Sequence, residues 1–237
     1  MTATPNLLLA SLPDGESDAL MAQLTPVDLA FGAVLYEPGQ AMRDVYFPLQ
    51  GLVSLRTLVG SRLGLEVGMV GREGMVGIPL ALGVALSPMR AVVQGRGAGL
   101  RMSRDRFDAA MGRSPLLTKA LLVYAGSLMA QIARTAACNR FHVVEARLAR
   151  WLLMARDRTG AADFAMTQEF LSAMLGVRRV GVSEAASTFQ RRKLIAYSRG
   201  HICIVDHAGL EAASCSCYGD EPVALPAWRP AGGASTS

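Results

Sequence analysis

A concentrated run of basic residues near the C-terminus is the clearest chemical signal in this sequence. The stretch from Arg178 to Arg199 holds one acidic residue, Glu184, against six basic ones, so it carries a local charge as large as the formal net charge of +5 of the whole chain. Cations gathered on one short segment are typical of a surface that contacts a polyanion. The six are Arg178, Arg179, Arg191, Arg192, Lys193 and Arg199. The segment is therefore a candidate for nucleic-acid binding.

Thiol and imidazole side chains form a second group in the last part of the chain. Its members are His201, Cys203, His207, Cys215 and Cys217. These are the ligand types that zinc prefers, and a Cys-x-Cys pair can supply two of them. Their spacing matches no closed zinc module, and the alternative is a buried Cys203 with two exposed thiols beyond it. We therefore predict no metal ligand and no cofactor, and leave a redox or metal role of the three cysteines open.

Catalytic groups are sparse. The sequence contains no nucleophile elbow and no phosphate-binding loop, because the glycines between Gly95 and Gly99 separate strands instead of preceding a helix. With only three histidines in the chain, general acid–base chemistry has few candidates. We predict that the protein is not an enzyme.

The mean hydropathy of +0.29 raises the question of a membrane span. The most apolar stretch, residues 116–133, is interrupted by Lys119, Ser127 and Gln131, which is unlike a span of about 20 apolar residues. The first residues lack the basic and apolar regions of a secretory signal, and four cysteines without one favour a reducing compartment. We expect a cytoplasmic protein with no membrane partner.

The elements that position these groups fall into three parts. Residues 5–30 predict a helical lead-in, and glycine-bounded apolar runs over 32–106 predict an all-β barrel or roll, with strands at 33–36, 45–47, 51–58, 63–70, 91–94 and 99–102. From Pro115 the period becomes helical, with Ser114 as the N-cap. Leu121, Ala125, Leu128 and Ile132 are spaced 4, 3 and 4 residues apart, and the apolar stripe around them is wide enough for two partners, the roll and a second copy of the chain. We predict dimerisation through these four residues.

The C-terminal part predicts two consecutive helices and a hairpin. A helix over 141–158 ends at Gly160; Thr167 caps a helix from Gln168 to Leu175, Gly176 makes a turn, and a second helix covers 178–193. Strands at 194–195 and 201–205 flank a turn that contains Arg199. This order is that of a winged helix-turn-helix, and the tail after residue 221 is expected to be disordered.

Three signatures in this order resemble the Crp/Fnr superfamily, the cyclic-nucleotide-receptor-like regulators, over about residues 10–215. They are Leu35-Tyr36-Glu37-Pro38-Gly39 with the strands that follow, Gly71-Arg72-Glu73-Gly74-Met75-Val76-Gly77, and Met166-Thr167-Gln168-Glu169-Phe170-Leu171-Ser172 with Leu175-Gly176-Val177-Arg178-Arg179. The resemblance implies a homodimer that binds double-stranded DNA and acts with RNA polymerase. By its place in the motif, Arg179 matches the family's base-contacting Arg, and Arg178 and Ser183 share the face that would reach base edges. The helix N-terminus suits Thr167 and Gln168 to phosphate contact. Arg199 at the wing turn is either a phosphate contact or an ordinary solvated arginine.

The chain departs from the nucleotide-binding members of the family. Where those members carry a ribose-binding Glu after the cassette glycine, Ile78 follows Gly77, and the phosphate-binding Arg position falls at Ser87 or Pro88. Arg90 is near but would need a register shift. We therefore expect no cyclic AMP binding in the usual manner, with Gly77, Ile78 and Arg90 as the candidate ligand residues. An iron–sulfur site is not expected either, because the first cysteine is Cys138.

The predicted fold class is α+β: an N-terminal double-stranded β-helix (a cyclic-nucleotide-binding-like β-roll), a long dimerisation helix, and a C-terminal winged helix-turn-helix. The predicted boundaries are 10–113 for the roll, 114–138 for the dimerisation helix, 139–217 for the DNA-binding domain and 218–237 for the tail. The predicted function is sequence-specific DNA binding by a transcription regulator whose roll senses a signal or serves as a scaffold. The alternative is a ligand- or partner-binding protein whose helix-turn-helix no longer reads specific DNA.

Overall fold

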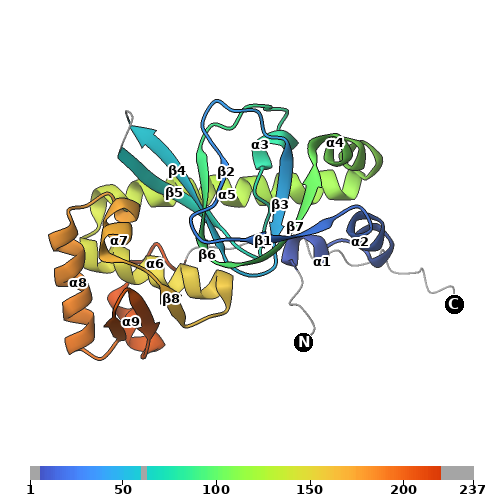
Figure 1. The fold of residues 1–237 in the computed structure, drawn as a ribbon. Coiled ribbons are helices and arrows are strands. Elements are labelled where there is room, and N and C mark those ends of the chain that lie inside the picture. The colour runs from blue at the N-terminus through green and yellow to red at the C-terminus, as the bar shows by residue number, and fades with distance from the viewer. Residues whose placement is uncertain (1–5, 60–62, 220–237) are drawn as a thin grey trace, which may run out of the picture.

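The computed structural model describes residues 6–59 and 63–219. It confirms the predicted α+β class: an N-terminal roll of antiparallel strands, one long helix, and a C-terminal unit of helices with a small sheet. In Figure 1 the long helix runs behind the roll, and the C-terminal unit lies at one end of the molecule, with α8 at its outer edge. The predicted tail, from residue 220 onward, lies outside the described residues.

Two antiparallel sheets form the roll. One has the strand order β1-β7-β3 and the other the order β2-β6-β4-β5. Alternating apolar residues turn inward from both sheets, and the inner cluster includes Val45, Phe47, Val53 and Val93. The strands are β1 (Thr25–Leu29), β2 (Val34–Tyr36), β3 (Asp44–Pro48), β4 (Leu52–Val59), β5 (Leu63–Val70), β6 (Arg90–Gly95) and β7 (Gly97–Ser103).

The lead-in differs from the expectation for residues 5–30. Two short helices, α1 (Leu7–Ala10) and α2 (Asp14–Met21), are followed by strand β1, which pairs with β7 along its whole length. This pairing is long-range, so a local pattern interrupted by Pro26 does not show it. Asn6 caps α1 and donates from Nδ2 to the carbonyls of Pro48 and Gly74, both at 2.9 Å, which fixes the lead-in to the roll.

Two more helices complete the N-terminal half, α3 (Ile78–Ala81) and α4 (Arg104–Arg113). The turn before α3 requires a glycine at residue 74. A Cβ there would lie 1.9 Å from Cζ of Tyr124, a fully buried residue of the long helix. The absent side chain at Gly74 therefore lets the roll approach the helix closely.

The long helix, α5, runs from Pro115 to Phe141, with Ser114 accepting a hydrogen bond from the backbone N–H of Leu117 as predicted. Among the described residues it is the one helix long and apolar enough to cross a membrane by length and composition. Eight of its residues, however, are buried within this fold. The apolar composition of α5 is therefore also that of a helix packed on the roll.

The C-terminal unit begins with α6 (Val144–Thr159), which Gly160 ends with φ = 70°. A three-stranded antiparallel sheet of order β8-β10-β9 and three helices pack around the buried face of α6. The expected helices and hairpin are present, whereas β8 and α9 were not predicted. The remaining elements are β8 (Asp163–Ala165), α7 (Gln168–Leu175), α8 (Arg179–Arg191), β9 (Ile195–Ser198), β10 (His201–Ile204) and α9 (His207–Ala213).

Buried polar contacts join the two halves of the chain. Arg158 of α6 forms an ion pair of 3.1 Å with Glu73 of the roll, and both side chains are at most 7% exposed. The turn at Gly176, between α7 and α8, has φ = 63°, and a Cβ there would lie 2.6 Å from Cδ1 of Leu65 in β5. The C-terminal unit is therefore packed directly against the hairpin of β4 and β5.

Candidate nucleic-acid interface

Helix α7 presents its N-terminal turn to solvent. The side chain of Thr167 accepts a hydrogen bond of 3.1 Å from the backbone N–H of Phe170, as an N-cap residue does. Thr167 is exposed and Gln168 half-buried, while Leu171 and Met174 on the opposite face are buried. A helix N-terminus with free backbone N–H groups suits the oxygen atoms of a phosphate.

Helix α8 has two distinct faces. Val182, Ala185, Ala186 and Phe189 are buried against the rest of the unit. The opposite face is polar and basic, with one exposed apolar exception, Val180, at 60% exposure. The residues of this face are Arg179, Val180, Ser183, Glu184, Ser187, Gln190 and Arg191. The buried face fixes the orientation of α8, so the polar face is held outward.

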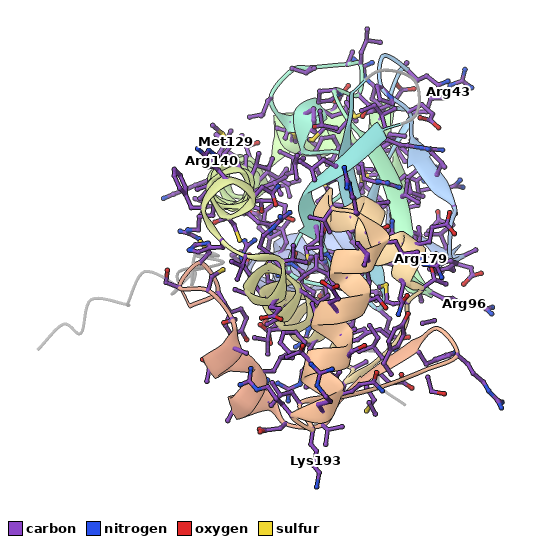
Figure 2. All side chains as sticks on the ribbon, turned by 90° about the vertical axis from the view of Figure 1, so that its left-hand side faces the viewer. Arg43, Arg96, Met129, Arg140, Arg179 and Lys193 are labelled. Atoms are coloured by element: carbon purple, nitrogen blue, oxygen red, sulfur yellow. The ribbon has the colours of Figure 1, made fainter. Side chains whose placement is uncertain are left out.

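The basic residues predicted to meet DNA are brought to one end of the molecule. Arg178 is the N-cap of α8 and Arg179 its first residue; both are exposed, and Ser183 lies one turn further along. Figure 2 looks onto this face and shows Arg179 and Lys193 at opposite ends of α8. The predicted base-contacting residues therefore share one accessible face at the N-terminal end of the helix.

The turn between β9 and β10 forms a wing. Arg199 is exposed and has φ = 50°, and Gly200 follows with φ = 79°. Tyr197 anchors this hairpin, since its hydroxyl donates to the carbonyl oxygen of Met166 and its own carbonyl accepts from Gln190 Nε2. Arg199 thus extends from a supported turn, separately from α8.

A small cavity of about 140 Å³ lies between the roll and α5. Gly77 and Ile78 line it, together with Met75 and Leu55. Arg90 does not line it; its Nη2 instead pairs with Oε1 of Glu37 at 3.1 Å, and both side chains are one-third exposed. Arg90 as a ligand residue therefore stays a prediction, and in this structure its guanidinium is paired with Glu37.

The prediction for the dimer seam is wrong in register. Leu121, Ala125 and Leu128 are at most 7% exposed, and Ile132 packs on the same cluster, because all four face the roll of their own chain. The face of α5 that is left to solvent lies one position further along and includes Leu122 at 49% and Met129 at 66% exposure. Figure 2 labels Met129 and Arg140 on α5, which is seen end-on at the edge of the molecule. The four predicted residues therefore pack within one chain, and dimerisation through α5 stays a prediction.

The structure also separates the predicted thiol and imidazole group. Cys203 is on β10 with His201 on the same face, opposite the buried Ile202 and Ile204, as predicted from strand alternation. His207 contacts Arg156 through a 2.8 Å interaction of Nδ1. Cys215 and Cys217 instead lie beside two residues from the end of α5, Cys138 and His142. The Cys-x-x-x-His spacing at a predicted helix end was the signal for this pairing, and the sequence reading missed it.

Comparison with known proteins finds one matching family model and many similar solved structures. Residues 146–213 match the model of the Crp-like helix-turn-helix domain, and a search of curated protein sequences finds no match. The structure is similar to that of FixK2 from Bradyrhizobium japonicum, with 15% identity, a TM-score of 0.69, and coverage of 81% of this chain and 98% of that one.

Two further solved structures have the same fold. A CRP-family transcriptional regulator from Thermus thermophilus gives 19% identity and a TM-score of 0.64, covering 86% of this chain and 100% of that one. The c-di-GMP-responsive global regulator CLP from Xanthomonas campestris gives 16% identity and a TM-score of 0.65, covering 81% and 99%.

The fold is therefore that of a transcriptional regulator of the Crp/Fnr type, which confirms the resemblance predicted from the sequence. Its C-terminal unit contains a Crp-like helix-turn-helix DNA-binding domain. Two of the similar structures are described as those of transcriptional or global regulators.

Proposed function

We propose that this protein is a homodimeric, cytoplasmic transcription regulator that reads a specific DNA sequence and acts with RNA polymerase. The exposed face of α8 is the observation that carries the proposal. Its buried side holds the helix in place, and its N-terminal end presents Arg178, Arg179 and Ser183 to solvent. A helix of this kind enters the major groove and contacts base edges with its first residues.

The contacts divide into two kinds. Arg179 is suited to donate to guanine, and Ser183 to accept or donate at a base edge. Val180, which the sequence reading did not select, is exposed beside Arg179 and suits the methyl group of thymine. Thr167 and Gln168 at the start of α7, and Arg199 in the wing, would contact phosphates. Base contacts of this set would give specificity, and phosphate contacts would position the domain.

The solvent face of α5 supplies a seam for a second copy of the chain. Its exposed residues recur at intervals of 4, 3, 4 and 3, which is the spacing of a helix that pairs with another helix. Three of them are small, so two helices could approach closely. The residues are Leu122, Gly126, Met129, Ala133 and Ala136. Pairing through this face would give a two-fold dimer and a pseudo-palindromic DNA site.

The roll is proposed to be a sensor or scaffold that does not take cyclic AMP in the family's usual manner. Among the residues that the structure describes, its cavity is lined largely by apolar side chains and by no arginine or lysine. A cyclic phosphate buried there would have no cationic partner, and an unpaired buried charge is strongly disfavoured. Any effector of this cavity would be small and apolar.

Selection of genomic DNA fragments by the purified protein, followed by sequencing, tests the proposal. We expect a two-fold symmetric motif that persists as salt is raised while overall affinity falls. Retention of fragments with no common motif would instead support the alternative, a protein whose helix-turn-helix no longer reads sequence.

A further inference from the structure

Four metal-binding side chains converge where the long helix ends. Cys138 and His142 are one turn apart at the end of α5, joined by a 3.1 Å hydrogen bond from the His142 N–H to the Cys138 carbonyl. Cys215 and Cys217 come from the segment after α9, more than seventy residues later in the sequence. One ligand atom from each of the four lies within 4.8 Å of all the others. The fold, and not the local sequence, brings this set together.

Two of the six ligand–ligand separations are close to those around a single tetrahedral ion, and all six are within 4.8 Å. With zinc–sulfur bonds of about 2.3 Å and zinc–nitrogen bonds of about 2.0–2.1 Å, tetrahedral angles place neighbouring ligand atoms roughly 3.5–3.8 Å apart. The Sγ atoms of Cys138 and Cys215 are 3.5 Å apart. Sγ of Cys217 is 3.7 Å from Nδ1 of His142. Both pairs are therefore already at the distance that a shared ion requires.

The ligand chemistry selects the metal. Three thiols and one imidazole form a Cys₃His set, which is one of the usual closed sets for structural zinc. Calcium and magnesium bind through oxygen ligands, and the four side chains offer none. All four cysteines of the chain are free thiols in the structure. The set is complete with four protein ligands, so a water ligand is not needed.

Two arginines of α6 surround the cluster. Three thiolates around a divalent zinc leave one excess negative charge, which favours nearby cations. Arg150 donates from Nε to the carbonyl oxygen of Cys217 at 3.4 Å, and Arg147 donates to Oδ1 of Asn139, the residue after Cys138, at 2.7 Å. Both arginine residues are at most 8% exposed. They hold the backbone around the ligands and balance the charge, as the surroundings of a metal site usually do.

We propose that Cys138, His142, Cys215 and Cys217 bind one zinc ion that ties the end of α5 to the C-terminal end of the helix-turn-helix domain. The ion would join two segments that otherwise meet through α6, so it would restrict how the DNA-binding domain turns relative to the long helix. The site itself does not depend on the proposed function. Any effect of the zinc ion on DNA affinity does depend on the proposed function.

The test begins with the full chain, purified under reducing conditions. We expect elemental analysis to find about one zinc per chain, and X-ray absorption to show three sulfur ligands at ~2.3 Å and one nitrogen ligand at ~2.0–2.1 Å. Cobalt substitution should give the visible absorption of a tetrahedral thiolate site. Iron with sulfide, a shell of oxygen and nitrogen alone, or no metal retained or taken up when zinc is added would each overturn the proposal.

Single substitutions assign the ligands. Cys217→Ser and His142→Asn should lose the stoichiometric zinc and the cobalt spectrum, whereas Cys203→Ser, in a cysteine outside the cluster, should retain both. Equal zinc content in all three variants would overturn the assignment. If a ligand variant fails to fold, the X-ray absorption spectrum of the wild-type protein still decides whether three sulfur atoms and one nitrogen atom bind the metal. DNA binding that fails while zinc is retained would count against the proposed function alone.

Discussion

The indole Nε1 of Trp151 in α6 donates a hydrogen bond of 2.6 Å to Oε1 of Glu66 in β5, and both side chains are buried. This contact joins the C-terminal unit to the roll. Burial raises the pKa of Glu66 to about 7, although hydrogen bonds from Ser54 and Trp151 oppose the rise. The junction between the two parts of the molecule therefore contains a carboxyl group that changes charge near neutral pH.

Replacing this carboxyl group should change how stability depends on pH. Folding raises the pKa of Glu66 above its ordinary value of 4.5, so its contribution to stability is most favourable below pH 4.5 and is lost as the pH rises through 7. We expect Glu66→Gln to raise the free energy of unfolding more at pH 8 than at pH 5, with a difference on the order of 3 kcal/mol. Urea unfolding at the two pH values measures this. Glu37→Gln, at a partly exposed carboxylate, is the control, and equal pH dependence of Glu66→Gln and wild type would contradict the prediction.

The solvent face of α5 can be tested with one charge. Met129→Glu would place two like charges near the two-fold axis of the proposed dimer and should weaken association by about 3 kcal/mol or more, roughly a hundredfold in Kd. Sedimentation over a range of concentrations measures this. Val205→Glu, at a similarly exposed apolar residue of the C-terminal unit, should remain dimeric. Leu128→Glu should lower the melting temperature instead, since Leu128 lies in the core of the roll. A dimer unchanged in Met129→Glu would place the interface elsewhere.

Two arginines separate base reading from phosphate contact. Arg179→Ala should weaken the free energy of binding to the preferred site by ~1–3 kcal/mol. It should also blur one position in each half-site of a selected-sequence logo. Arg199→Ala should weaken all sequences alike and lower the salt slope by about one unit, with the logo intact. Selection experiments at two salt concentrations give both quantities. A uniform loss with an unchanged logo in Arg179→Ala would mean that α8 does not read the groove as placed.

Cyclic AMP provides the test of the cavity. We expect isothermal titration calorimetry to detect no binding at micromolar concentrations, because no arginine or lysine of the described part of the chain lines the cavity and Arg90 pairs with Glu37. Arg90→Ala should therefore behave as wild type. Micromolar binding that Arg90→Ala abolishes would show that this arginine turns inward and that the nucleotide site is functional.

The sequence by itself was sufficient for features that depend on near neighbours. Alternating apolar residues bounded by glycines located β2 to β7 within about two residues, and the cap at Thr167 and the turn at Gly176 located the helix-turn-helix. Strand alternation, N-caps and left-handed turns are set by a residue and the few around it. The candidate DNA-binding residues followed because they lie within one short segment.

Only the tertiary structure decided which partner each surface meets. Two apolar seams, one residue apart, run along α5, and their spacing is the same; the packing of the roll covers Leu121 and Leu128 and leaves Leu122 and Met129 exposed. Strand β1 likewise depends on pairing with β7. The cluster of Cys138, His142, Cys215 and Cys217 likewise depends on the fold, which brings two distant segments together. In each case the deciding contact joins residues far apart in the sequence, and a periodic pattern shows that a face is buried or paired but not what lies against it.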